Sequence, residues 1–342
     1  MTGDLWQDRR IPGVLDWLLE ADIPAVRYLT MRDLLDRPAD DLEMHRVLEE
    51  SHRQGAIAEI LSHMEQDGYW VKPGAGYNPK YRSTVWSIIM LAQIGASVEA
   101  DERVAKACAY LLDHALTAGG QFSTNGMPSG TVDCLQGNLC WALLELGCGD
   151  PRLDTALEWM ARTVTGEGIA PAEERNAAVR YYAYKCGPLF ACGVNGGLPC
   201  AWGAAKVMLA FGRLPIERRT PPIQRAIDQG IAFLLSIDPA DAAYPVGDGG
   251  KPSRNWWKFG FPVFYVTDLL QVAEALTRLG CGGDVRLANL ISLIRGKQTP
   301  NGRWRLEYDY AGKTWVEVGK KNTENKWVTL RALRVLKSVI TS

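Results

Sequence analysis

The sequence predicts an all-α fold of the (α/α)6 type, in which six inner and six outer helices close into a toroid formed by the whole chain, residues 1–342. Three observations support this prediction. One plan recurs along the chain: a loop, a helix ending at glycine, a short polar turn and a second helix. The two helices of each copy differ in polarity. Finally, the unpaired helices at the two ends of the chain complement each other.

The predicted elements follow the chain in order. A ring-closing helix at 10–22 precedes the repeats of residues 24–340, whose first pair is an inner helix at 25–36 and an outer helix at 41–65. The next pairs are 81–95 with 102–116, 134–147 with 151–164, 200–212 with 222–236, and 263–280 with 285–298, before a last inner helix at 327–340. Glycine is a common residue after a helix end, and Gly95, Gly147, Gly212 and Gly280 stand at such positions.

The first helix of each pair is apolar nearly all round, as in Trp86, Ile88 and Leu91. The second keeps a polar face, as in Asp154 and Glu158. Helices that are apolar all round are buried, and one-sided helices face water, so each pair has an inner and an outer member. A closed ring also hides the apolar faces that an open helical solenoid, the competing architecture, would have to cap.

Composition excludes several classes of protein. The 38 Lys and Arg residues balance 39 Asp and Glu residues, which argues against a nucleic-acid or polybasic membrane binder. No apolar run approaches a membrane span, although peripheral membrane contact stays open. The polar residues 1–10 predict no secretory signal, so we expect a cytoplasmic protein whose eight cysteines are free thiols or metal ligands. The 12 Trp and 12 Tyr against 7 Phe indicate rings with one polar side.

The loops between repeats carry a second pattern, in which a glycine turn is followed by an aromatic residue. It occurs as Gln66-Asp67-Gly68-Tyr69-Trp70, as Gly119-Gly120-Gln121-Phe122, and as Gln298-Thr299-Pro300-Asn301-Gly302-Arg303-Trp304. With these loops the chain resembles the squalene-cyclase and protein-prenyltransferase repeat superfamily of terpenoid cyclase-like toroids, as a single-domain bacterial-type member. The resemblance covers roughly residues 55–340. It implies an α/α toroid that acts as a cyclase or prenyl transferase on an apolar, isoprenoid substrate.

The densest group of reactive side chains is a set of thiols. Asp133-Cys134 opens the third inner helix, and Cys186, Cys192 and Cys200 stand before and at the start of the fourth. Neighbouring inner helices start side by side, so Cys134, Cys192 and Cys200 are the predicted zinc ligands, with Cys186, Asp133 or Asp268 as the fourth. The resembled prenyltransferases use an Asp-x-Cys pair and a distant His. Here the pair is one residue shorter and no His lies beyond position 114. The alternative is that these are buried packing thiols.

The remaining candidates surround the predicted mouth of the ring. Asp268, Asp133 and Tyr265 are the catalytic candidates, and Asp268 among aromatic residues is either a general acid with a raised pKa or a paired core carboxylate. The predicted substrate-binding residues are Tyr81, Arg82, Trp86, Asn138, Trp202, Lys206, Trp256, Trp257 and Trp327.

Three functions fit these residues. The first is an enzyme acting on an apolar, isoprenoid small molecule in a central aromatic-lined cavity, with or without zinc-thiolate assistance; its aromatic rings would stabilise developing cations. The second is a non-catalytic module that binds a lipid or a peptide, favoured by the missing Asp-x-Asp-Asp motif of class II cyclases. The third, a glycan-active barrel, needs two placed carboxylates, for which Asp133, Asp268, Glu307 and Glu317 are the candidates.

Overall fold

The computed structural model describes residues 11–340, which fold into thirteen α-helices with short 3-10 helices in the loops between them. The polar residues 1–10, from which no secretory signal is predicted, lie outside the described residues. Within residues 11–340 extended pairing is limited to isolated bridges, and no strand forms. None of the described helices is long and apolar enough to cross a membrane.

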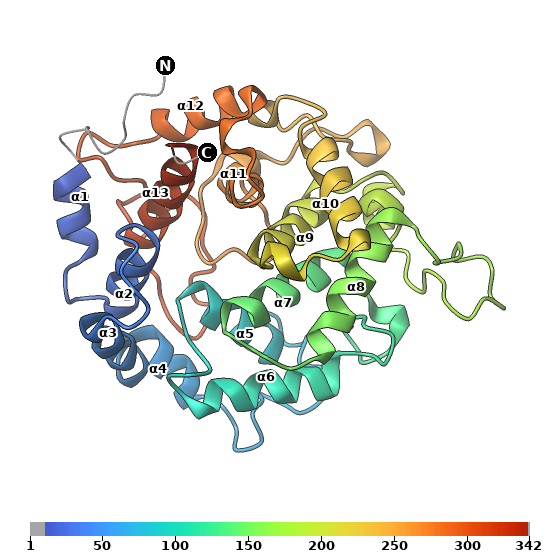
Figure 1. Cartoon of the computed structure of the whole chain (residues 1–342), viewed down its shortest axis with the longest axis horizontal. Coiled ribbons are helices and arrows are strands. Elements are labelled where there is room, and N and C mark those ends of the chain that lie inside the picture. Colours follow the sequence, from blue (N-terminus) through green and yellow to red (C-terminus); the bar gives the residue numbers. More distant parts are fainter. Residues whose placement is uncertain (1–10, 341–342) are drawn as a thin grey trace.

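The helices lie in two layers around a common centre (Figure 1). The inner layer consists of α2 (Pro24–Asp33), α5 (Thr84–Gln93), α7 (Asp133–Glu145), α9 (Ala201–Arg213), α11 (Leu269–Arg278) and α13 (Lys326–Ile340). The outer layer consists of α1 (Ile11–Leu18), α3 (Leu42–Arg53), α4 (Gly55–Ser62), α6 (Glu102–Ala115), α8 (Arg152–Thr165), α10 (Pro221–Leu234) and α12 (Ala288–Gly296). Neighbouring inner helices pack on one another, since α7 contacts α5 and α9, α11 contacts α9 and α13, and α13 contacts α2.

Burial separates the two layers as the polarity pattern predicts. Every residue of α5 is buried except Gln93. In α8 the buried residues recur on one face, and its polar residues Asp154 and Glu158 are paired at the outside with Arg218 and Thr220 of the neighbouring repeat. One hydrophobic core runs from Val14 to Leu336.

The two glycine-aromatic loops that end in tryptophan join an outer helix to the next inner helix. Trp70 and Trp304 are fully buried, and their indole N–H groups donate 2.7 Å hydrogen bonds to Ile60 O and Ile294 O at the ends of α4 and α12. Their backbone N–H groups donate to Thr84 Oγ1 of α5 and Thr329 Oγ1 of α13. The same contacts at two distant places show that the pattern is a structural repeat.

Several predicted boundaries differ from the structure, and the following differences are the most informative. The outer helix predicted at 41–65 is broken into α3 and α4, because Gly55 has a φ of 75° at the junction. The inner helix predicted from 263 begins at Leu269, and residues 263–267 are loop. Gly95, Gly147 and Gly280 follow helix ends with positive φ as predicted, whereas Gly212 lies within α9.

The axis of the ring holds little free space. The cavity between the inner helices measures about 40 Å³, and its lining combines apolar and amide side chains with the charged residues Glu145, Glu274, Arg278, Arg331 and Arg334. Glu145 accepts hydrogen bonds from Arg32 and Arg213 there, at 2.6 and 2.7 Å. The predicted aromatic-lined cavity is therefore not on the axis, which an ionic network fills.

Candidate functional site

A larger hollow opens at the rim of the ring, at the N-termini of α7 and α9. This cleft has a volume of about 450 Å³. The loops before α5, α9 and α11 complete its wall. It is lined by Tyr77, Lys80, Val132, Cys134, Lys185, Cys192, Val194, Asn195, Cys200, Ala201, Trp202, Tyr244, Pro245, Val246, Lys251, Ser253, Trp256 and Tyr265. This set brings together six of the predicted residues: Cys134, Cys192, Cys200, Trp202, Trp256 and Tyr265.

Aromatic rings form two walls of the cleft. Trp256 packs edge-on against Trp202 with ring centroids 6.2 Å apart and lies 5.6 Å from the Tyr244 ring. On the other side, Tyr77 and Tyr265 have centroids 6.3 Å apart. Burial raises the pKa of Tyr265, so its phenol is neutral at physiological pH. The wall is apolar and suits a hydrocarbon or a developing cation.

The floor of the cleft carries a pair of thiols. Cys200 is the N-cap residue of α9, and Cys134 lies in the first turn of α7. The hydrogen bond from the Cys134 thiol, helped by the N–H groups of Gly203 and Trp202, lowers the pKa of Cys200 to about 6. The same pairing and burial raise the pKa of Cys134. The pairing therefore favours the anionic form of Cys200 over that of Cys134, and a thiolate is a nucleophile.

Two ionisable groups lie beneath this floor. Burial raises the pKa of Asp133 to about 7, although its contact with the Cys186 thiol opposes the rise. Its Oδ2 atom has no hydrogen-bond partner among the described residues. Burial lowers the pKa of Lys206 to about 8 against the attraction of Cys134 and Cys200, and its Nζ donates to Thr267 Oγ1 and to Gln271 Oε1. A proton donor and a cation thus lie directly behind the thiols.

The structure adds polar rim residues that the sequence analysis missed. Among residues 11–340, Lys80, Lys185 and Lys251 line the cleft, and no carboxylate does. The Lys80 ammonium lies 5.7 and 5.8 Å from the ring centroids of Tyr77 and Tyr265. A cationic rim above an apolar wall suits a molecule with an anionic head and an apolar body. These lysines lie in long loops, where neither helical period nor repeat pattern marks them.

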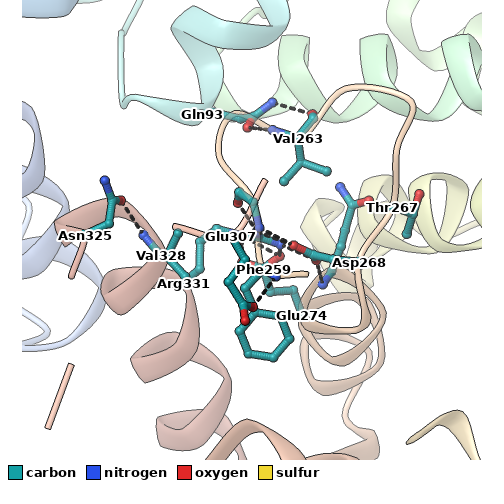
Figure 2. A network of polar contacts seen from close by, with 12 residues as sticks. Gln93, Phe259, Val263, Thr267, Asp268, Glu274, Glu307, Asn325, Val328 and Arg331 are labelled. Atoms are coloured by element: carbon teal, nitrogen blue, oxygen red, sulfur yellow. Dashed lines mark hydrogen bonds and ion pairs between the residues drawn. The ribbon is translucent and has the colours of Figure 1, made fainter. Parts of the chain in front are cut away.

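Asp268 is a paired core carboxylate, the second of the two alternatives. It caps α11 by accepting the Gln271 N–H at 2.8 Å, and it binds Arg331 through both oxygens at 3.0 Å (Figure 2). Arg331 also holds Glu274 at 2.7 Å and the Gly260 carbonyl at 2.6 Å. With both oxygens occupied and only 3% of the residue exposed, Asp268 has no path to the cleft.

Three predicted substrate-binding residues around α5 pack elsewhere. Trp86 is fully buried and donates its indole N–H to Tyr77 O at 2.7 Å. The Tyr81 ring packs against Trp86 with centroids 5.2 Å apart. Arg82 is exposed, donates to the Thr314 carbonyl at 3.3 Å and lies over the Trp315 ring. These contacts fix the loop before α5 and leave none of the three in the cleft.

Three further candidates also lie outside the cleft. Asn138 lines the small axial cavity and donates to the Phe264 carbonyl at 3.3 Å. Trp257 donates its indole N–H to Ala240 O at 3.0 Å. Trp327 stacks on Phe261 with ring centroids 4.8 Å apart. Each contact is a packing or loop-anchoring contact.

The carboxylates required by a glycan-active site are not gathered in one place. Glu307 accepts from Lys297 at 2.7 Å and from the Phe259 N–H, and Glu317 accepts from the Gly312 N–H. Neither lines the cleft, and Asp133 lies beneath it. The arrangement does not offer the facing carboxylate pair that glycoside hydrolysis needs.

The structure does not test whether zinc is bound at the predicted cysteines. Cys134 and Cys200 are in contact and Cys192 lines the same cleft, but residues 11–340 contain no group of three or more Cys, His, Asp or Glu side chains placed to hold one ion. Asp268, one candidate for the fourth ligand, is held by Arg331. Zinc needs three or four donors, of which this arrangement supplies two. Zinc at Cys134, Cys192 and Cys200 stays a prediction for elemental analysis.

Comparisons with known proteins return structures only. No protein-family model and no curated protein sequence matches the chain. Among solved structures, the type II terpene cyclase MstE from Scytonema in its apo form is similar at a TM-score of 0.31 and 15% identity, over 86% of this chain and 98% of that one. An aspartate-to-asparagine variant of MstE in complex with its substrate geranylgeranyl dihydroxybenzoate is similar at a TM-score of 0.30 and 14% identity, over 88% and 98% of the two chains. At these values the similarity is loose and assigns no activity to this chain.

Proposed function

We propose that the protein is a single-domain (α/α)6 toroid of the cytoplasm that binds an apolar, isoprenoid substrate in the rim cleft and acts on it as a terpenoid cyclase-like or prenyl-transferring enzyme. The observation that carries this proposal is the composition of the cleft: the part of the chain that the structure describes places five aromatic rings, three lysines and no carboxylate around about 450 Å³. Five aromatic faces stabilise a hydrocarbon chain and any cation formed on it.

The residues of the cleft take separate roles in this proposal. Trp202, Trp256 and Tyr265 hold the apolar body, and the rim lysines bind an anionic head such as a diphosphate. The Cys200 thiolate is the nucleophile. Asp133, whose pKa is raised to about 7, is still partly protonated at neutral pH and is the proposed acid, and its proton reaches the cleft through the adjacent thiols.

A second function is favoured by one observation. Asp268, the acid first expected in the site, forms an ion pair with Arg331, and the remaining acid, Asp133, lies below the floor of the cleft. A cleft that binds without catalysing, in a lipid- or peptide-binding module, has the same aromatic wall. Turnover therefore has to be measured separately from binding.

Calorimetric titration with farnesyl diphosphate tests the binding step, and the chain offers a matched pair of tryptophans. Trp202 and Trp257 are both half-buried, but only Trp202 lines the cleft. We expect saturable binding that Trp202→Ala weakens about tenfold, since an aromatic contact contributes about 1–1.5 kcal/mol. Trp257→Ala should leave the affinity unchanged. Equal losses in both variants, or no binding by the unmutated protein, would refute the proposed site.

Turnover is assayed on a panel of prenyl diphosphates and polyenes with Cys200→Ala and Asp133→Asn. The enzyme hypothesis is supported if the unmutated protein forms product, both variants lose this activity, and both still bind farnesyl diphosphate with an unchanged dissociation constant. Binding without product from any member of the panel supports the non-catalytic module.

A further inference from the structure

The two thiols of the cleft floor occupy equivalent positions in two repeats. Cys134-Leu-Gln-Gly137 begins α7, and Cys200-Ala-Trp-Gly203 begins α9. Each cysteine is followed three residues later by a glycine, which lies one turn further along the same face of the helix. The two neighbouring inner helices thus present the same short motif to each other.

The glycines allow α7 and α9 to approach closely at this point. A Cβ atom at Gly137 would lie 2.6 Å from backbone atoms of α9 at residues 206 and 207. A Cβ at Gly203 would lie 3.5 Å from the Asp133 Cβ and 3.8 Å from the Cys134 Sγ. A Cβ at Gly203 would thus be in van der Waals contact with Cys134, which places the first turn of α9, with Cys200 at its N-cap, against the start of α7.

Both thiols are free, in hydrogen-bond contact and half-buried in the wall of an open cleft. A dissolved reagent therefore reaches them, whereas most structural thiols are closed off. Cys200 stands at the N-terminus of α9, where the helix favours a negative charge on sulfur. The pair has the contact, the access and the asymmetry of a dithiol that exchanges with disulfides.

We propose that Cys134 and Cys200 form a reversible redox site, which closes into a disulfide by exchange with a low-molecular-weight disulfide that enters the cleft. The Cys200 thiolate attacks one sulfur of the reagent, forms a mixed disulfide and releases one reagent thiolate. Cys134 then loses its proton, attacks the Cys200 sulfur, closes the protein disulfide and releases the second reagent thiol. The two cysteine sulfurs lose two electrons together, and the small disulfide gains them.

Closure changes the floor of the cleft. The disulfide removes the nucleophilic thiolate from the cleft and ties the first turns of α7 and α9 together at the base of the aromatic wall. The oxidised protein therefore binds farnesyl diphosphate differently from the reduced protein, where the proposed function holds. Disulfide formation itself does not depend on that function.

A second thiol pair in the chain provides an internal comparison. Cys108 and Cys148 are also hydrogen-bonded, but Cys108 is 1% exposed in α6 and neither residue lines the cleft. Cys192 is the competing partner for Cys200, since its thiol lines the same cleft and interacts electrostatically with Cys200. The proposal thus specifies the Cys134–Cys200 disulfide among several disulfides that these cysteines can form.

The test is disulfide mapping of the full chain. Reduced protein is incubated with oxidised glutathione, trapped with N-ethylmaleimide, and mapped by mass spectrometry without reduction. We expect a Cys134–Cys200 link that dithiothreitol reverses, retained in Cys192→Ser and in the double variant Cys108→Ser/Cys148→Ser. Cys134→Ser should instead accumulate glutathione on Cys200. Should that variant fail to fold, the map of the unmutated protein decides alone.

Three results would overturn the redox site. They are a link between Cys192 and Cys200, glutathione that stays on Cys200 of the unmutated protein without closure, and one equivalent of bound zinc that protects the thiols from exchange. Failure of farnesyl diphosphate binding leaves the disulfide map unaffected, so the redox site and the proposed function are tested independently.

Discussion

The Asp268 carboxylate offers the sharpest test of which residues are structural. Asp268→Asn keeps the size of the side chain and the acceptor that caps α11, and removes the negative charge that faces Arg331. The side chains of Arg331 and Asp268 are 5% and 4% exposed, so water does not replace the lost ion pair. Because Arg331 retains Glu274, its charge is left half-compensated rather than alone.

The magnitude follows from this geometry. Removing one partner of a buried ion pair costs about 3–5 kcal/mol, and the remaining Glu274 contact points to the lower end, about 3 kcal/mol. For 342 residues the entropy of unfolding is roughly 0.7 kcal/mol per degree, so the melting temperature should fall by about 4 °C.

Urea and thermal unfolding of Asp268→Asn beside the unmutated protein measure this loss. Asp284→Asn is the matched control, since Asp284 also caps a helical turn and pairs with an arginine, but at the surface. Its shift should be clearly smaller. Farnesyl diphosphate binding at 20 °C should be the same in all three proteins. A variant at Asp268 that stays as stable as the unmutated protein but loses turnover would refute the structural role and restore Asp268 as the acid.

Two further predictions concern α7. Burial raises the pKa of Asp133 from its ordinary value of 3.8 to about 7, so the folded state binds the proton more tightly and the free energy of unfolding falls as pH rises through this range. Asp133→Asn lacks this penalty, and urea titrations should show its stability advantage growing by about 2–3 kcal/mol between pH 5 and pH 8; parallel curves would contradict the buried acid. Gly137→Ala places a methyl group 2.6 Å from the α9 backbone and should lower the free energy of unfolding by about 1–3 kcal/mol. The control is Gly13→Ala, whose methyl group meets nothing within 4 Å and should leave the stability unchanged or raise it in the same unfolding assay. A Gly137→Ala protein of unmutated stability would mean that α7 and α9 are not in close contact.

The sequence predicted the helical repeats well because two independent signals coincide. Apolar-all-round and one-sided helices alternate, and the anchors at Trp70 and Trp304 recur with the same contacts. The predicted helix boundaries were wrong where tertiary contacts override the local pattern of apolar and polar residues. The aromatic run before Asp268 has the composition of an inner helix, but Asp268 caps the helix and Arg331 holds the preceding loop through the Gly260 carbonyl.

The sequence predicted the part of the candidate site that depends on neighbouring inner helices beginning side by side. That reasoning brought Cys134, Cys200 and Trp202 together correctly. It misplaced Trp86 and Asn138, because a helix that is apolar all round does not reveal which face it turns to the cleft. It missed the rim lysines and Tyr244, since long loops have no periodicity that defines their path.

A crystal structure of the reduced protein with farnesyl diphosphate tests the central claim most directly. The account predicts density for the hydrocarbon chain between Trp202, Trp256 and Tyr265, with the diphosphate at the rim beside Lys80, Lys185 or Lys251. Density at another surface, or an empty cleft at a saturating concentration of the ligand, would contradict it.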